Sequence, residues 1–411
     1  MKMAVELVTT GSELLSGRSV NTHARTLAEA LFPLGLALAR DTTVPDDAAA
    51  IEESIRSALG RADIVLVTGG LGPTSDDLTR DVVSKIAGRG IVMHEPSRLA
   101  IADRYAKTNR KMNAFVERHA LVIEGAEVLA NSAGLAPGER ISVNNSVLFL
   151  LPGPPREFVA VLDEHVLPWL RANRTGPVPE IRLFQVCGIG ESDIVSRLEP
   201  EGFPGPGVDV SYCAAIGRVE IRLFAPAANA AQLDKAARLV REKIAGSIYD
   251  EGSRDLAEVV GQLLRERKAT LAVAESCTGG LVGHRITGVA GSSYYFKGGV
   301  IAYADEVKER DLGVSAEDLK NHGAVSEAIA KQMAEGVRRR FGTTFGLAVT
   351  GIAGPGGGSN EKPVGLVYIA VADAKGCVAK QSRFAGSRDN IKDWGSQVAL
   401  DQLRLRLLDG I

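Results

Sequence analysis

Short apolar runs, each followed directly by a glycine-rich or polar loop, are the feature that most constrains how this chain folds. In the first part of the chain they span residues 4–9, 62–68 and 147–151. Amphipathic segments alternate with these runs, for example the helical spacing of Ala24, Leu27, Ala28 and Leu31. The alternation predicts a parallel α/β sheet, in which ligands bind at the carboxyl ends of the strands.

Two breaks in the pattern divide the 411 residues into three predicted domains. The turn-forming stretch N-R-T-G-P-V-P at 173–179 marks the first break, and D-E-G-S at 250–253 marks the second. At roughly 150 residues per domain, this chain length predicts two or three domains. We therefore expect domains at residues 1–172, 173–250 and 251–411.

The two later domains also mix strands and helices. The middle one is predicted to be a small α+β unit, and the last one is predicted to be α/β. Strands are expected at 182–187, 208–213, 219–224, 269–274, 299–303, 344–350 and 365–372, and helices near 191–198, 230–245 and 281–287.

Charge and cysteine content exclude several classes of function. The formal net charge is −2, so no global positive field holds a nucleic acid. The longest apolar runs fall far short of the ~20 residues that span a bilayer, and neither secretion nor membrane insertion is expected. The four cysteines form no C-x-x-C pair, which argues against a disulfide framework or a structural zinc site. We expect a cytoplasmic protein.

A serine stands at a predicted strand-to-helix turn in the last domain, within A-E-S-C-T-G-G at 274–280. A hydroxyl there is exposed above the sheet, and free N–H groups at the helix start favour an anion, as a serine nucleophile requires. The alternative is that Ser276 and Thr278 only cap the helix. Cys277 is the competing nucleophile, although no histidine stands at a motif spacing that would activate it.

Two further loops follow strands in this domain. If a strand ends at Tyr303 and Asp305 is the N-cap, Lys308 is the third residue of the next helix. The helix dipole then favours the neutral amine that a general base needs, whereas the alternative is a solvated surface lysine. Thr350 opens T-G-I-A-G-P-G-G-G, whose glycines allow a ligand close to the backbone but match neither a P-loop nor a dinucleotide motif.

Two adjacent carboxylates, Asp76 and Asp77, follow a glycine loop in the first domain, T-G-G-L-G-P-T-S-D-D-L-T at 68–79. Carboxylate oxygens are the ligands that a hard divalent cation prefers. The alternative is a capping box formed by Thr74 and Asp77 at a helix that begins near Asp77. Glu13 and Asp46 are further acids at loop positions that could converge on the same place.

Five motifs follow one another over about residues 253–411: A-E-S-C-T-G-G, Y-A-D-E-V-K, H-G-A-V-S, T-G-I-A-G-P-G-G-G and E-K-P-V-G. Together they resemble the nicotinamide mononucleotide deamidase domain of the CinA (competence/damage-inducible protein) family. The resemblance implies that Ser276 is the nucleophile with Lys308 and Tyr303 nearby, and that no cofactor is needed. The residues it implies for nucleotide binding are Thr278, Gly279, Thr350, Gly351, Gly354 and Arg388.

The implied reaction begins with attack of Ser276 Oγ on the carboxamide carbon, while Lys308 takes the hydroxyl proton. Backbone N–H groups after Ser276 would hold the oxyanion, ammonia would leave, and water would release nicotinate mononucleotide. Arg388 suits the phosphate because a guanidinium binds phosphate oxygens well, although it can also be read as a surface arginine.

The first domain carries G-S-E-L-L-S-G, V-P-D-D, the glycine loop, N-S-A-G-L-A-P-G and L-P-G-P-P. These motifs resemble the molybdopterin-binding fold in the version found at the N-terminus of CinA proteins. The resemblance implies hydrolysis of ADP-ribose to AMP and ribose 5-phosphate with a divalent metal, magnesium or similar, at Asp46 and Asp77. The implied substrate-binding residues are Glu13, Asn21, Gly69, Gly70, Gly72 and Thr74.

The middle domain is similar to a KH-type domain. Its loop, Gly188-Ile189-Gly190-Glu191, lacks the G-x-x-G pattern, so we expect a spacer or dimer element and no nucleic-acid partner. The family resemblance also implies a homodimer. Two rival functions remain: a molybdopterin nucleotidyltransferase, and a non-catalytic nucleotide-binding or DNA-uptake accessory protein.

Overall fold

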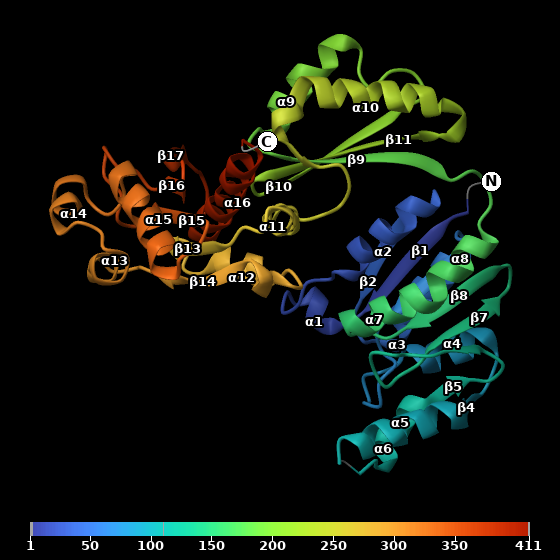
Figure 1. Cartoon of the computed structure of the whole chain (residues 1–411). Helices are drawn as coiled ribbons and strands as arrows, with labels where there is room; N and C mark the ends of the chain where they lie inside the picture. The colour runs from blue at the N-terminus through green and yellow to red at the C-terminus, as the bar shows by residue number, and fades with distance from the viewer. Residues whose placement is uncertain (1–2, 110, 410–411) are drawn as a thin grey trace. The chain divides into compact units, whose positions relative to one another are not determined.

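The computed structural model describes residues 3–109 and 111–409. The chain separates into two compact units, Met1–Pro179 and Glu180–Ile411, and each is described by itself (Figure 1). The predicted three-domain division at 172 and 250 stays a prediction.

The first unit is built on a six-stranded sheet of order β2-β1-β3-β8-β7-β6. Its first four strands are parallel, β7 is antiparallel to β8, and β6 is antiparallel to β7 and so runs in the direction of the first four. This arrangement confirms the predicted parallel α/β sheet. The strands are β1 (Val5–Thr10), β2 (Leu38–Val44), β3 (Ile64–Thr68), β6 (Glu127–Leu129), β7 (Gly138–Val143) and β8 (Ser146–Leu151).

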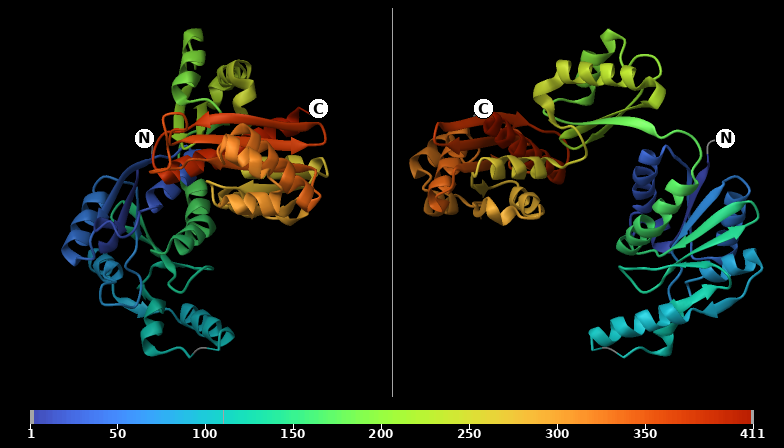
Figure 2. Two further views of the ribbon diagram at one scale, coloured as in Figure 1. Left: turned by 90° about the vertical axis from the view of Figure 1, so that its left-hand side faces the viewer. Right: turned by 45° about the vertical axis from the view of Figure 1, so that its right-hand side comes forward.

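Helices cover both faces of this sheet, because alternate residues of its buried strands point to opposite sides (Figure 2). In β3, Ile64 and Leu66 pack with one helical layer, whereas Val65 and Val67 pack with the other. The first layer contains α2 (His23–Leu31), α7 (Pro155–Val161) and α8 (Leu167–Asn173), and the second contains α3 (Ala48–Leu59) and α4 (Thr79–Ala87).

Between α4 and β6 the chain forms an excursion that the sequence pattern did not predict. Its two short strands pair antiparallel with each other and belong to a sheet of their own (Figure 1). The excursion contains β4 (Ile91–Met93), α5 (Glu95–Lys107), α6 (Ala114–Glu117) and β5 (Leu121–Ile123).

A buried ion pair ties the glycine loop of the first unit to its sheet. Arg80 Nε lies 3.0 Å from Glu139 Oε1, with side-chain exposures of 6% and 0%. Arg80 also donates to the carbonyl of Leu71 at 3.2 Å, and Glu139 accepts the N–H of Ile123 at 2.7 Å. The loop therefore depends on a carboxylate in β7, more than 60 residues away.

We expect Arg80→Met to lower the stability of the first unit by about 3–5 kcal/mol, because it leaves the Glu139 carboxylate buried without its partner. Native-state hydrogen exchange of β8 amides measures this change in the first unit alone. Arg56→Met, which breaks an exposed pair with Glu52, is the control and should cost at most about 1 kcal/mol. Equal effects of the two substitutions would contradict the role given to the buried pair.

The second unit contains two sheets. The smaller has the order β10-β11-β9-β12 and packs against two helices around a core of its own. The predicted helix at 191–198 is confirmed to the residue. These elements are β9 (Pro179–Cys187), α9 (Glu191–Leu198), β10 (Asp209–Ala215), β11 (Arg218–Pro226), α10 (Ala230–Ile244) and β12 (Ile248–Asp250).

The larger sheet has the order β14-β13-β15-β16-β17, in which β14, β13 and β15 are parallel, β16 is antiparallel to β15, and β17 is antiparallel to β16. Alternate residues of β13 again face different layers: Leu271 and Val273 join one core, and Ala272 and Ala274 join the other. The strands are β13 (Leu271–Glu275), β14 (Phe296–Ile301), β15 (Phe345–Gly351), β16 (Leu366–Asp373) and β17 (Gly376–Arg383).

Helices also cover both faces of this larger sheet. The helix predicted at 281–287 has the expected bounds. One layer contains α11 (Leu256–Glu266), α12 (Leu281–Thr287) and α16 (Arg388–Leu408), and the other contains α13 (Asp305–Leu312), α14 (Ala316–His322) and α15 (Glu327–Phe341).

Two predicted element boundaries are wrong. The strand expected at 299–303 ends at Ile301, because after Ala302 the chain turns to enter α13 with Ala304 as N-cap. Lys308 is therefore the fourth helical residue and not the third. In the first unit, α4 begins at Thr79 and its N-cap, Leu78, makes no side-chain capping bond, so the Thr74–Asp77 pair is no capping box.

Candidate functional site

The Ser276 turn lies where three parallel strands of the larger sheet end side by side. Ser276 directly follows β13, and its N–H donates to the carbonyl of Val349 in β15 at 2.9 Å. On the other side, the N–H of Ala302 donates to the carbonyl of Glu275 at 2.8 Å. The topology thus brings three of the predicted motifs to one edge of the sheet.

The start of α12 after this turn is occupied by the chain's own carboxylate. Glu275 accepts hydrogen bonds from the N–H groups of Gly280, Val282 and Gly283. The expectation that these helix-start groups are free for an anion is therefore wrong. The capping alternative is also wrong, because the N-cap is Gly280 and the side chain at the helix start is that of Glu275, not of Ser276 or Thr278.

Cys277 lies beneath the turn and points into the core. Its Sγ is 3.0 Å from where a Cβ on Gly351 would stand. Burial raises the pKa of the Cys277 thiol to about 12, so the sulfur stays protonated near neutral pH. This environment disfavours Cys277 as a nucleophile. The neighbouring Thr278 is also buried and lies against Gly395 of α16, and within residues 3–109 and 111–409 its hydroxyl has no hydrogen-bond partner.

Lys308 is not a solvated surface residue, because only 1% of its side chain is exposed. Its Nζ donates to Asp305 Oδ1 at 3.0 Å and to the carbonyl of Tyr303 at 3.1 Å. Sequence reasoning expected burial to act together with the helix dipole in favour of a neutral amine. It missed the ion pair with the Asp305 carboxylate.

Arg388, the first residue of α16, joins two of the other predicted segments. One guanidinium nitrogen donates to the Tyr303 hydroxyl and another to the carbonyl of Gly354, each at 2.7 Å. The structure therefore brings Arg388, Tyr303 and the glycine-rich loop together. Tyr303 remains 59% exposed, so its ring is accessible from solvent.

Thr350 holds a neighbouring loop of the site in place. Its side chain is fully buried and its hydroxyl donates to the carbonyl of Ala324 at 2.8 Å, so it holds the loop before α15. Lys362 secures the same loop by donating to the carbonyls of His322 and Val325. The H-G-A-V-S and E-K-P-V-G motifs thus meet beside the end of β15.

In the first unit, the predicted acidic residues line one cavity of about 390 Å³ beyond the ends of β1 and β3. The structure leaves Asn21 and Gly72 outside this lining. Asn21 Nδ2 donates to the hydroxyls of Thr9 and Thr43, and a Cβ on Gly72 would meet Asp77 Oδ2 at 2.4 Å. The predicted residues that line the cavity are Glu13, Asp46, Gly69, Gly70, Thr74 and Asp77.

The two predicted metal ligands each use one carboxylate oxygen within the protein. Asp46 Oδ2 accepts the N–H of Ser12 at 2.8 Å, and Asp77 Oδ2 accepts the N–H of Thr74 at 2.8 Å and also its hydroxyl. In the part of the chain that the structure describes, no three His, Cys, Asp or Glu side chains are grouped to hold a metal. Two carboxylates fit a magnesium ion that takes its remaining ligands from water and substrate phosphates.

His23 lines the same cavity and was missed by sequence reasoning. Its ring is buried and packs on Phe158, with 4.4 Å between the ring centroids. Burial lowers the pKa of His23, and among the described residues neither ring nitrogen has a hydrogen-bond partner. The imidazole is therefore neutral near neutral pH. A lone histidine at a helix start gives no motif, which is why the pattern did not reveal it.

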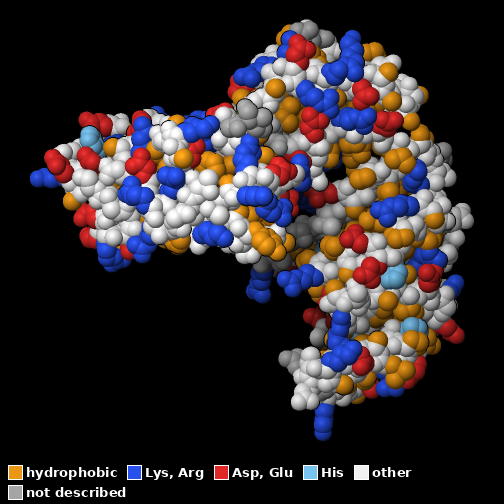
Figure 3. All heavy atoms as spheres, in the orientation of Figure 1, with side chains coloured by type: hydrophobic (Ala, Val, Ile, Leu, Met, Phe, Trp, Pro, Cys, Tyr) orange, Lys and Arg blue, Asp and Glu red, His pale blue; other side chains and the backbone are white. Residues whose placement is uncertain are grey.

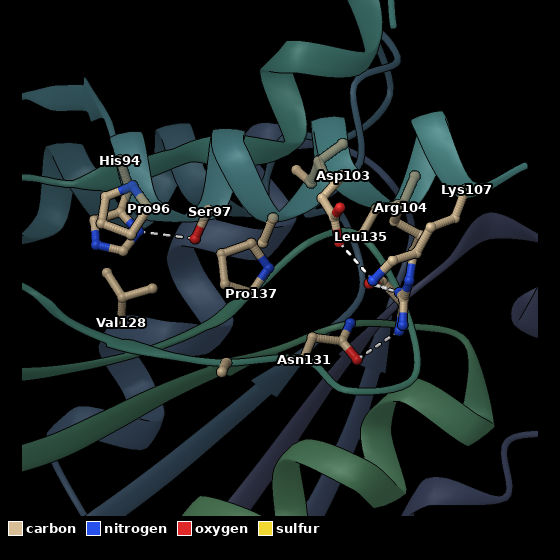
Figure 4. Close-up of a pocket in the computed structure, with 14 residues that line it drawn as sticks. His94, Pro96, Ser97, Asp103, Arg104, Lys107, Val128, Asn131, Leu135 and Pro137 are labelled. Atoms are coloured by element: carbon tan, nitrogen blue, oxygen red, sulfur yellow. Dashed lines mark hydrogen bonds and ion pairs between the residues drawn. The ribbon is translucent and has the colours of Figure 1, made fainter. Parts of the chain in front are cut away.

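A second cavity of the first unit, about 360 Å³, lies between α5 and the loop after β6 (Figure 4). Its polar side chains bind one another or the backbone. His94 Nδ1 lies 2.8 Å from Ser97 Oγ, Lys107 pairs with Asp103 at 2.7 Å, and Arg104 donates to backbone carbonyls of the loop. The cavity shares none of the predicted site residues.

Two family descriptions match the chain. Residues 6–172 match "Probable molybdopterin binding domain", and residues 253–407 match "CinA C-terminal domain". The fold and these matches define a protein in which a molybdopterin-binding-type domain is joined to a CinA-type α/β domain.

The chain belongs to the CinA family, as the resemblance predicted. A CinA-like protein of Gemmatimonas aurantiaca is 43% identical, with coverage of 98% of this chain and 96% of that protein. A CinA-like protein of Geobacter sulfurreducens is 41% identical, with coverage of 99% and 100%. A crystal structure of competence/damage inducible protein CihA from Agrobacterium tumefaciens is 39% identical, covering 37% of this chain and 93% of that chain with a TM-score of 0.36.

The surface carries charges of both signs. Lysine and arginine side chains are interspersed with aspartate and glutamate over the face drawn in Figure 3. Each helix within the described residues is too short or too polar to cross a bilayer.

Proposed function

We propose that this protein is a hydrolase with two activities. The C-terminal part deamidates nicotinamide mononucleotide to nicotinate mononucleotide and ammonia. The N-terminal unit hydrolyses ADP-ribose to AMP and ribose 5-phosphate. The observation that carries the first activity is the meeting of the Ser276 turn, the buried Lys308 and the Tyr303–Arg388 pair at adjacent strand ends. The proposal includes a cytoplasmic homodimer that binds no nucleic acid.

In the deamidase reaction, Ser276 Oγ attacks the carboxamide carbon as its proton passes to Lys308. The N–H groups of Gly280, Val282 and Gly283 already bind Glu275, so the proposed oxyanion donors are the N–H groups of Cys277 and Thr278. Lys308 returns the proton to the leaving nitrogen as the intermediate collapses to ammonia and an acyl-serine ester, and water then hydrolyses this ester.

For ADP-ribose hydrolysis, the proposed place of the pyrophosphate is the cavity beside the glycine loop. Gly70 has a φ of +64° and a Cβ there would meet the Thr79 hydroxyl at 2.3 Å, so only glycine lets the loop approach the phosphates in this way. Asp46 and Asp77 would hold a divalent metal through their remaining oxygens. When bound, this metal supplies positive charge to the phosphates and acidifies a water molecule.

The match to a probable molybdopterin binding domain favours a second candidate for the N-terminal unit, molybdopterin adenylylation. The same cavity and carboxylates suit both reactions, because each acts on a pyrophosphate or triphosphate with a divalent cation. Molybdopterin-dependent release of pyrophosphate from ATP, without AMP release from ADP-ribose, would select this candidate.

Incubation with each substrate tests both activities and their proposed division. We expect ammonia from nicotinamide mononucleotide with or without EDTA, and AMP from ADP-ribose only without EDTA, because hard-cation ligands are proposed only in the N-terminal unit. Asp46→Asn should reduce AMP release without changing ammonia release. If the wild-type protein releases no ammonia, the deamidase assignment is wrong and a non-catalytic role gains support.

The neighbouring Asp47 offers a matched control for Asp46→Asn. Asp47 is the N-cap of α3 and accepts the N–H of Ala50, and it does not line the cavity. Asparagine caps a helix as well as aspartate does, so Asp47→Asn should keep both activities. Equal loss in the two variants would point to general disturbance of this loop instead of a lost metal ligand.

A further inference from the structure

Glu275 is a buried carboxylate beside the proposed nucleophile to which the reaction assigns no role. It is the last residue of β13, and only 2% of it is exposed. Its side chain accepts three backbone hydrogen bonds, from Gly283 at 2.8 Å, Gly280 at 3.0 Å and Val282 at 3.1 Å. A buried carboxylate needs such partners, and here all three come from the first turn of α12 and its N-cap.

Hydrogen bonds fix both ends of the short turn that runs from Glu275 to the start of α12. At one end, the carbonyl of Glu275 accepts the N–H of Ala302, and Ser276 donates to Val349, which fixes the chain to β14 and β15. At the other end, the Glu275 side chain holds the start of α12. Between them Ser276 accepts the N–H of Gly279 at 3.1 Å. The turn that carries the Ser276 hydroxyl is therefore held by backbone bonds to the strands on one side and by the neighbouring Glu275 side chain on the other.

The same bonds decide where an anion can bind. The N–H groups at a helix start normally attract phosphate or a developing oxyanion, but here Glu275 already uses three of them. Its own negative charge also disfavours a second anion at this place. The N–H groups of Cys277 and Thr278 are held at a fixed distance from the helix start, which suits donors that must be in place before the reaction.

We infer that Glu275 is a positioning residue, whose carboxylate holds the Ser276 turn in its reactive geometry by binding the start of α12. This inference rests on Ser276 as the proposed nucleophile but not on the identity of the substrate. Replacement by glutamine keeps the size of the side chain and places an NH₂ group against backbone N–H donors. The turn must then shift, and a misplacement of about 1 Å costs roughly 10² in rate.

The test compares Glu275→Gln with the wild-type full chain in two assays. The first is nicotinamide mononucleotide deamidation, in which we expect kcat to fall by roughly 10² while KM changes little. The second is the rate at which a fluorophosphonate probe labels Ser276, followed by mass spectrometry, and it should fall in the same proportion. Hydrogen exchange should become faster at residues 280–283 and stay unchanged in β16.

Glu258→Gln is the matched control. Glu258 also closes a helix start, because its carboxylate accepts the N–H of Asp255 in the capping box of α11. Its substitution should leave both assays unchanged. Wild-type labelling of Ser276 in Glu275→Gln, or a higher KM with unchanged kcat, would overturn the inference.

Two further outcomes have defined meanings. If the wild-type protein reacts with the probe but releases no ammonia, the proposed substrate is wrong while the labelling rates still test Glu275. If Glu275→Gln fails to fold, Glu275→Asp takes its place, because the shorter carboxylate keeps the charge but cannot reach all three N–H groups. Slower labelling in a folded Glu275→Asp supports the inference, and an unchanged rate refutes it.

Discussion

Ser276→Ala is expected to lower ammonia release from nicotinamide mononucleotide by roughly 10³-fold or more, because the covalent step has no other nucleophile. The fold should survive, since the Ser276 backbone, and not its side chain, makes the bonds to Val349 and Gly279. Ammonia release by the purified variant, with its thermal unfolding compared with that of the wild type, measures both effects.

Cys277→Ala is the control for this experiment. The thiol is buried and its pKa is raised to about 12 by that burial, so it supplies almost no thiolate near neutral pH. The variant should therefore keep turnover close to that of the wild type, with some loss of stability from the small cavity it creates. If activity is lost in Cys277→Ala and kept in Ser276→Ala, the nucleophile is the cysteine.

The sequence revealed those parts of the fold that carry a strong apolar pattern. Buried strands such as β3 and β13, and the helices α9 and α12, stand at or within a few residues of their predicted positions. The edge strands β2 and β17 were missed. Both β2 and β17 are largely polar and partly exposed, so neither gives the apolar run on which strand prediction depends.

For the candidate sites, sequence reasoning found the segments but not the contacts among them. The motifs showed that Tyr303 and Arg388 belong to one domain, but their 2.7 Å hydrogen bond depends on how α16 packs. The burial of the Glu275 carboxylate was not predicted either, because a glutamate at the end of an apolar run is normally expected to be solvated. Its partners are determined by the path of the turn, which propensity and spacing do not specify.

Lys308 shows the same limit of sequence reasoning. Its place near a helix start was expected, and the dipole argument favoured a neutral amine. The structure adds nearly complete burial and an ion pair with Asp305. The surroundings of the Lys308 amine are therefore determined by tertiary contacts and not by its position in the helix.

Lys308→Arg is therefore expected to lower deamidation by roughly 10²-fold or more, because a guanidinium keeps the positive charge beside Asp305 but cannot accept the serine proton near pH 7. Ammonia release by the purified wild type and variant, measured at one pH near neutrality, gives the difference.

Lys331→Arg is the matched control, since Lys331 also pairs with a carboxylate, Glu327, on a helix of the same unit. It should keep the rate of the wild type. Near wild-type turnover in Lys308→Arg would show that the charge alone matters, for example by holding the carbonyl of Tyr303 in place. The proton acceptor would then be the Tyr303 hydroxyl or a water molecule. Tyr303→Phe separates these two, because it removes the tyrosine hydroxyl and would lower ammonia release only if that hydroxyl accepts the proton.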